Sequence, residues 1–172
     1  MLESLDTARL LLRERTLDDL DACMEMDRDP EVTRHVPGPW HDPVAHRRFV
    51  EERTTRVYPP GLGYWSIFER LAPDRFIGWV LLIPENGVGP DIEIGWRLVR
   101  DAWGRGIASE AAGAVVRHAF ETVGLNEIVA GIAQGNAASR HLATKLGMRC
   151  APDALPDAEG YIYYRLARVL PR

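Results

Sequence analysis

The chain is predicted to be an α/β protein, with a central mixed β-sheet and helices on both of its faces. Short alternating apolar segments and longer amphipathic segments succeed one another along the sequence. In the C-terminal half their order is strand, helix, strand, helix, strand, which places two parallel strands side by side through a right-handed crossover. The length of 172 residues, 46% of them hydrophobic, can bury a sizeable core without disulfides or metals.

Composition excludes several classes of protein. No run approaches the ~18 apolar residues of a membrane span, and charges interrupt the N-terminus too early for a secretory signal. Cys23 and Cys150 lie far apart without C-x-x-C or His-rich companions, so we interpret them as packed thiols. A net charge of −4 with interspersed signs argues against a nucleic-acid groove and permits an amine substrate. We expect one cytoplasmic domain over residues 1–172, without a metal, nucleic-acid or membrane partner.

The first third of the chain predicts a strand and two helices. Apolar and charged residues alternate over 8–13, which indicates a strand. Thr16, with Asp19 three positions later, is typical of a helix N-terminus, and this helix is expected to run to about Arg28. The second helix is expected to begin at Asp42-Pro43, a good N-cap and N1 pair, and the sequence Pro-Pro-Gly stops it.

The segment Val36–Asp42 between these helices contains two prolines and a tryptophan. We interpret it as a packed connector, with the border of a substrate groove as the alternative. Two strands then follow, Tyr64–Glu69 and Arg75–Ile83, and the turn Ala72-Pro73-Asp74 is expected to join them. A third strand is predicted at Asp91–Val99.

The remaining elements follow from the same criteria: helix Gly106–Val123, strand Glu127–Gln134, helix Asn136–Leu146 and strand Tyr161–Arg168. The first of these helices has an apolar stripe that suits packing on a sheet. Gly147 ends the second helix. The last strand is expected to pair with a segment near Met148–Ala151.

The turn Gly104-Arg105-Gly106 is the strongest functional signal in the pattern itself. Glycines without Cβ let backbone N–H groups approach a ligand, and the helix N-terminus that follows adds a partial positive charge. This arrangement favours a pyrophosphate. It is not a nucleotide P-loop, because no Gly-Lys-Ser/Thr follows, and Ser109 replaces the last glycine of the dinucleotide fingerprint.

The run Trp103-Gly104-x-Gly106-x-Ala108-x-Glu110-Ala111 is followed by Asn136-x-x-Ser139 and Lys145-Leu146-Gly147-Met148. This combination resembles the GNAT N-acetyltransferases, and specifically their RimJ/RimL-like branch. The resemblance is tightest over residues 91–148 and extends loosely to 7–13. It implies a central mixed sheet of about six to seven strands flanked by about four helices, with acetyl-CoA as co-substrate and an amine as acceptor. It also implies that strands 91–99 and 127–134 splay apart, with the pantetheine arm in the gap.

The resemblance further implies which residues bind the cofactor. Asn136 also suits a helix N-cap, and Ser139 suits a first-turn serine, so both have a purely structural alternative. Asp101 departs from the Gln or Arg that the family pattern has at this position. The implied contacts are pyrophosphate binding by Ala102, Trp103, Gly104, Arg105, Gly106 and Ile107, pantetheine pairing by the backbone of Trp96, Arg97, Leu98 and Val99, and arm contacts by Asn136 and Ser139.

The catalytic residues are less clearly marked. Many relatives of this kind have a tyrosine acid seven residues after the asparagine, where this chain has Ala143, so Ser139 is the expected proton donor. Many also have a carboxylate base five residues before the asparagine, where this chain has Gly131. Glu93 is then the acid that we expect to act as base, and a solvated strand acid is its alternative.

The missing strong base favours a low-pKa acceptor. A protein α-amine, with a pKa of ~7.7–8.0, is roughly one-tenth free at neutral pH, whereas a lysine at ~10.4 is free less than about once in a thousand. We therefore expect acetylation of a protein or peptide N-terminus. A small-molecule amine acetyltransferase and a non-catalytic acyl-CoA-binding module are the alternatives, and the pattern leaves open whether the chain is a monomer or a homodimer.

Overall fold

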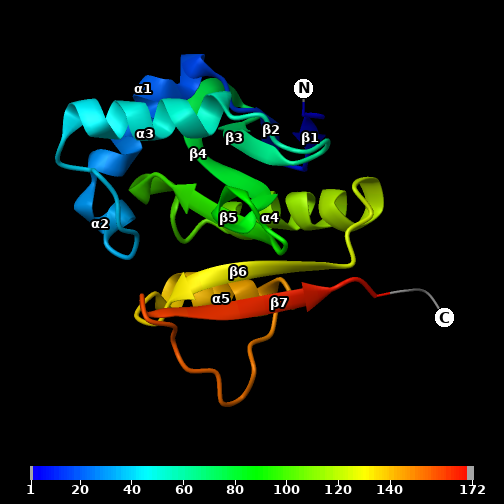
Figure 1. Ribbon diagram of the computed structural model, residues 1–172. Coiled ribbons are helices and arrows are strands. Elements are labelled where there is room, and N and C mark those ends of the chain that lie inside the picture. The colour runs from blue at the N-terminus through cyan, green and yellow to red at the C-terminus, as the bar shows by residue number, and fades with distance from the viewer. Residues whose placement is uncertain (1, 170–172) are drawn as a thin grey trace.

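Seven strands adjoin in chain order, β1 to β7, in one mixed sheet (Figure 1). The computed structural model describes residues 2–169. Every neighbouring pair is antiparallel except β5 and β6, which run parallel. The predicted α/β class with a central mixed sheet is therefore confirmed. The strands are β1 Leu5–Asp6, β2 Leu10–Glu14, β3 Gly63–Glu69, β4 Ala72–Pro84, β5 Ile92–Leu98, β6 Glu127–Ala133 and β7 Tyr161–Ala167.

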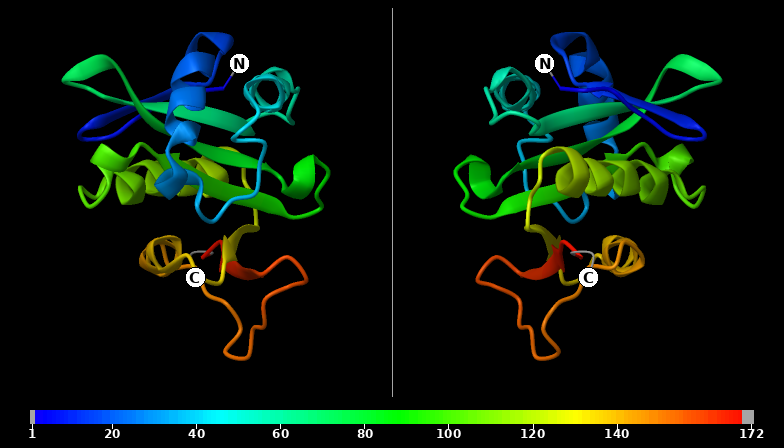
Figure 2. Two further views of the ribbon diagram at one scale, coloured as in Figure 1. Left: turned by 90° about the vertical axis from the view of Figure 1, so that its left-hand side faces the viewer. Right: turned by 90° about the vertical axis from the view of Figure 1, so that its right-hand side faces the viewer.

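Helices cover both faces of this sheet, and Figure 2 shows α4 and α5 on the side opposite α3. A 3-10 turn, Leu17–Asp19, precedes α1, another, Arg100–Ala102, precedes α4, and a third, Glu85–Gly87, follows β4. A π turn, His118–Thr122, continues α4. The α-helices are α1 Leu20–Arg28, α2 Pro30–Thr33, α3 Pro43–Thr55, α4 Ile107–Arg117 and α5 Ala137–Lys145.

The predicted helix starts are confirmed by their hydrogen bonds. Asp42 accepts from the N–H groups of Val44 and Ala45, both at 3.0 Å, so it caps α3. The Asn136 side chain accepts from the Ser139 N–H at 3.1 Å and caps α5. These bonds satisfy N–H groups that have no partner within their own helix.

The side chains of β4 point alternately to the two faces of the sheet, one of which packs against the main core while the other borders a cavity. Val80 and Leu82 face α4 and belong to the main core, together with buried residues such as Ala111 and Val115. Trp79 faces the other way and packs against a second cluster that α1 and α3 supply, including Met24 and Val50. Because side chains alternate along a strand, the cavity described below lies on this second face.

Three sequence-based expectations for the strands were wrong in detail. The first strand begins at Leu10, not at residue 8, and a short strand, β1, precedes it. The turn between β3 and β4 is Arg70-Leu71, because Glu69 pairs with Ala72; bulges in the ladder accommodate Pro73. The last strand pairs along its length with β6, and only Arg149 bridges to it from the segment 148–151.

The parallel strands β5 and β6 are paired only where Glu93 meets Val129. The ladder then ends, and the two strands part toward their carboxyl ends. Ligands in sheets of this kind bind at such ends, so the parting is the natural place to look for a site. Within residues 2–169, no helix is long and apolar enough to cross a membrane.

Candidate active site

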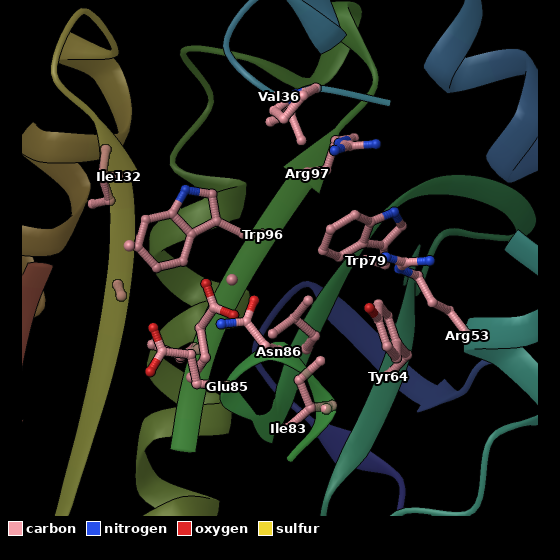
Figure 3. A pocket seen from close by; sticks show the side chains of 18 of the residues that line it. Val36, Arg53, Tyr64, Trp79, Ile83, Glu85, Asn86, Trp96, Arg97 and Ile132 are labelled. Atoms are coloured by element: carbon pink, nitrogen blue, oxygen red, sulfur yellow. The ribbon is translucent and has the colours of Figure 1, made fainter. Parts of the chain in front are cut away.

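A cavity of about 530 Å³ opens where β5 and β6 part. Figure 3 shows Trp96 of β5 and Ile132 of β6 on facing sides of the parting, with Tyr64 and Trp79 farther along the sheet. Asn136 and Ser139, at the start of α5, also line the cavity. Four of the residues predicted for the cofactor arm thus line one cavity, namely Trp96, Arg97, Asn136 and Ser139.

The open edge of β5 supplies backbone groups to the parting. The Val99 N–H donates to the Ile77 carbonyl at 3.1 Å, so it faces β4. In an antiparallel ladder, alternate residues direct their N–H and C=O groups to opposite sides. Trp96 and Leu98 therefore direct theirs toward β6, although Trp103 already donates to the Leu98 carbonyl at 3.0 Å. Of the four residues predicted to pair with pantetheine, Trp96 and Leu98 have the suitable orientation.

The predicted pyrophosphate loop has the backbone that its glycines indicated. Gly104 and Gly106 have φ angles of +70° and +75°, in the left-handed region that favours glycine. A Cβ on Gly104 would meet no atom within 4 Å, so the space above it is open. Gly106 is the N-cap of α4, and this 11-residue helix adds its positive end to the loop. An anion as large as a pyrophosphate fits this arrangement.

The side chains around the loop differ in their burial and in their ion pairs. Ala102 and Ile107 are buried in the core, whereas Trp103 is 45% exposed. The Arg105 side chain pairs with Glu69, so any contact from this residue to a phosphate is left to its backbone N–H. The Asp101 carboxylate, which would repel a phosphate, pairs instead with Arg75.

The N-terminal part of the family pattern anchors this loop. The Thr7 hydroxyl and the Arg9 N–H donate to one Glu110 oxygen, at 2.6 and 2.9 Å, and the Arg9 side chain binds the other at 2.7 Å. Burial opposes these bonds, yet together they hold the pKa of Glu110 below its ordinary value. Arg9 also donates to the Arg105 carbonyl at 3.0 Å. Residues at the start of the chain therefore fix the first turn of α4 and the loop before it.

We expect Gly104→Val to weaken CoA binding by well over tenfold, which is more than about 1.4 kcal/mol. The added side chain fills the open space above the loop and also strains a left-handed backbone. Gly124 is a matched control, because it has a φ of +79° and equally open surroundings outside the loop. Calorimetry on both variants separates the two effects. Equal CoA affinity in Gly104→Val and Gly124→Val would exclude the loop from the phosphate site.

Ser139 lies at the first turn of α5 with its hydroxyl toward β5. The Trp96 indole N–H donates to its Oγ at 3.3 Å, so the hydroxyl proton of Ser139 remains available to a ligand. Its backbone N–H is held by Asn136. The capping role of Asn136 is thus present, and it places Ser139 at the positive end of α5, where a developing thiolate would be stabilised.

Glu93 lines the same cavity at the position where β5 pairs with β6. Burial, and next the charge of Glu85, raise the pKa of Glu93 from 4.5 to about 7, against a smaller opposing effect of the Gly131 N–H. A Cβ on residue 131 would lie 3.8 Å from Glu93 Oε1. The carboxylate of Glu93 therefore lies beside position 131, the place where the family resemblance implies a base.

Sequence reasoning missed several side chains of the cavity. Val36 and Pro37 line it, so the loop Val36–Asp42 borders the groove as its alternative interpretation had it. Tyr163 of β7 also lines it, and partial burial, followed by the interaction with Glu85, raises the pKa of Tyr163 far above the ordinary value. Arg15, just beyond β2, is a further lining residue. The alternating tyrosines of β7 could have indicated a lined face, but nothing local to Arg15 marks it.

A buried ion-pair network holds the loop Val36–Asp42 in place. Asp27 of α1 binds Arg97 of β5 at 2.6 Å and His46 of α3 at 3.2 Å. The Trp40 ring packs edge-on against His46, and the Arg97 guanidinium lies over it, 5.0 Å from its centroid. The Arg97 side chain is thus committed to structure, so a cofactor role for this residue would have to come from its backbone.

The fold and these contacts define an acetyltransferase of the GNAT class. The sequence model of the acetyltransferase (GNAT) domain matches residues 9–149, so the chain belongs to this family. It therefore carries an acetyl-CoA-dependent N-acetyltransferase domain. The fold also resembles RimL, the ribosomal L7/L12 alpha-N-protein acetyltransferase in complex with coenzyme A, with a TM-score of 0.75 at 17% identity over 96% of this chain and 98% of that one. This likeness is one of fold.

Closer relatives are named for the same transfer. The chain is 32% identical to the FsC-acetyl coenzyme A-N(2)-transacetylase of Aspergillus fumigatus, over 84% of this chain and 64% of that protein's length. It is 31% identical to N-acetyltransferase p20 of Bacillus licheniformis, over 86% of this chain and 83% of that protein. The solved acetyltransferase of Agrobacterium tumefaciens superimposes with a TM-score of 0.81 at 27% identity, covering 98% of this chain and 96% of that one.

Proposed function

We propose that the chain transfers the acetyl group of acetyl-CoA to the α-amine of a peptide or protein N-terminus. The observation that supports this acceptor is Glu93, an enclosed carboxyl whose pKa of about 7 lies close to the ~7.7–8.0 of an α-amine. Proton transfer from such an ammonium is nearly balanced, whereas transfer from a lysine at ~10.4 is unfavourable by more than three pKa units.

In the proposed reaction Glu93 takes a proton from the acceptor ammonium, directly or through a water. The freed nitrogen forms a bond to the thioester carbonyl carbon, and the carbon–sulfur bond breaks. Ser139 then donates its hydroxyl proton, or a hydrogen bond, to the departing thiolate, and the positive end of α5 stabilises that charge. The nitrogen gives up its second proton as the amide forms, and this proton restores the Ser139 hydroxyl or protonates the thiolate, so that the free thiol of CoA is released. The loop Ala102–Ile107 and the open edge of β5 hold the CoA portion in register for this attack.

Acetylation of a small-molecule amine is the second candidate. It is supported by the Aspergillus relative, whose name places its transfer on an N(2) position of FsC. A non-catalytic acyl-CoA-binding module is the third candidate. It is supported by Ala143, which stands where the family resemblance implies a tyrosine that donates a proton.

A panel of amines separates these candidates. Acetyl-CoA turnover is followed by release of free thiol, with peptides of free N-terminus, N-terminally blocked peptides containing lysine, polyamines and amino-acid amides. We expect turnover with free α-amines and little with blocked lysine peptides. Turnover restricted to polyamines or lysine side chains would contradict the proposal, and CoA binding without any turnover would favour the non-catalytic module.

A further inference from the structure

Arg15 is a buried charge without a partner among the residues that the structure describes. It is 6% exposed, yet its Nε and Nη2 atoms make no hydrogen bond. Its guanidinium lies over the Tyr64 ring, 3.7 Å from the centroid. Stacking on an aromatic ring offsets only part of the free energy of taking a charge out of water. A guanidinium left in this condition indicates a ligand that supplies the missing acceptor atoms.

The buried acids near Arg15 are already engaged. Asp19 accepts from both Nη atoms of Arg13, at 2.9 and 2.7 Å, and from the Ser66 hydroxyl at 2.9 Å. Asp27 is held by Arg97 and His46. Neither carboxylate therefore accepts a hydrogen bond from Arg15. An anion that pairs with Arg15 has to come from outside the residues that the structure describes.

The cavity of the active site is where such an anion can arrive. Arg15 lines this cavity, and so do Arg53 and Arg56 from the end of α3. Glu85 and Glu93 line it as well, and the Arg56 guanidinium lies beside Gly87, in the turn that begins at Glu85. Arg15 at one end and Glu93 at the other give the cavity one positive and one negative group, which matches a ligand that has an anion and an amine.

The sheet sets the separation of these two ends. The Arg15 N–H donates to the Tyr64 carbonyl, Tyr64 pairs with Leu81, and Leu81 pairs with Gly95, two residues from Glu93. Three strand spacings place Arg15 roughly 14 Å from Gly95 along the floor, and the two long charged side chains shorten the span further. The Leu81 side chain lies over Gly95, so the floor between the two ends is apolar. A compact acceptor that spans this floor can reach both ends.

We infer that Arg15 binds a carboxylate of the acceptor, so the acceptor is an α-amine with a carboxylate a few bonds away. This inference rests on the proposed function and specifies its substrate class. A planar guanidinium fork fits a carboxylate through two parallel hydrogen bonds. The carboxylate has two possible sources, an acidic first side chain of a peptide and the α-carboxylate of a free amino acid.

Two matched pairs of acceptors distinguish these sources. The first pair is a C-terminally amidated peptide that begins with aspartate and its counterpart that begins with asparagine; the second is alanine and alaninamide. We expect the carboxylate member of at least one pair to be preferred by about 10- to 100-fold in kcat/KM, the range for a hydrogen-bonded charge. The kcat/KM values are compared per free amine, because a carboxylate raises the pKa of the neighbouring ammonium. Arg15→Met should reduce that preference to below about threefold. Equal use within both pairs by the wild type, or a preference that survives in Arg15→Met, would overturn the inference.

Measurements of stability and of binding distinguish a failure of this inference from a failure of the proposed function. Arg15→Met removes an unpaired buried charge, so its melting temperature should equal or exceed that of the wild type. Arg13→Met, two residues away, should melt lower because it leaves the Asp19 carboxylate without its arginine. An Arg15→Met protein that melts as low as Arg13→Met would make Arg15 structural and overturn the inference. If no acceptor is acetylated, the proposed function fails, and calorimetry of the same four compounds on the CoA complex decides the carboxylate site by itself.

Discussion

Replacing Ser139 by alanine is expected to lower kcat by roughly 10²- to 10⁴-fold, the range for removal of a positioned acid. The hydroxyl is held by the Trp96 indole, stands at the mouth of α5 and borders the cavity that also contains Glu93. Its proton remains free for the leaving thiolate. CoA affinity should stay within a few-fold, because the Asn136 cap needs only the backbone N–H of residue 139.

A companion variant separates proton donation from placement of the helix. Trp96→Phe removes the indole N–H that orients Ser139 but keeps the Ser139 hydroxyl and an aromatic ring at position 96, so its kcat should fall less than that of Ser139→Ala. Steady-state turnover and CoA titration of both variants provide the comparison. If turnover of Ser139→Ala with a good acceptor stays within about threefold of the wild type, Ser139 is a first-turn serine of α5 and nothing more.

Glu93→Gln is expected to change the pH dependence of kcat/KM as well as its size. With a pKa of about 7, the carboxyl of Glu93 is the wild-type group that must lose its proton, so the wild-type profile should rise and then level near pH 7. The variant relies on free amine, so its profile should continue to rise to the pKa of the acceptor, near ~8 for an α-amine. The rate loss is therefore largest and constant below pH 7 and shrinks above it.

The same substitution has an effect on stability with a definite sign. The folded-state pKa of Glu93 lies above its ordinary 4.5, so ionisation is less favourable in the folded than in the unfolded protein. Glu93 therefore destabilises the fold as pH rises from 4.5 to 7. Glu93→Gln should gain about 1–3 kcal/mol over the wild type above pH 7 and nothing below pH 4.5, as denaturant unfolding can show. For the kinetic prediction, pH profiles of kcat/KM that coincide in the wild type and Glu93→Gln would remove Glu93 from the mechanism.

Patterns local in sequence predicted the backbone of the candidate cofactor site well. The glycine pair at 104 and 106 has the left-handed backbone that the turn required, and Asn136 caps the helix that it was expected to begin. Both features depend on a few consecutive residues. The approximate bounds of most helices and strands also followed from periodicity and caps, since these too are local signals.

The acceptor side could not be predicted in this way. Arg15, Tyr64, Glu85 and Tyr163 come from four separate segments, and only the pairing of the sheet brings them to one face. The raised pKa of Glu93 likewise depends on burial and on Glu85, which approaches through the fold. The hairpin turn after β3 was misplaced because a ladder bulge, a tertiary feature, tolerates Pro73.

The central claim is that one cavity brings the thioester, Ser139, Glu93 and the acceptor amine together. A crystal structure of the ternary complex with CoA and a non-reacting analogue of a good acceptor tests it most directly. We expect the pantetheine between β5 and β6, the sulfur within hydrogen-bond reach of Ser139 Oγ, and the acceptor amine within reach of Glu93, directly or through one water. An acceptor bound on the α4 side of the sheet, or a cofactor outside the parting of β5 and β6, would contradict the account.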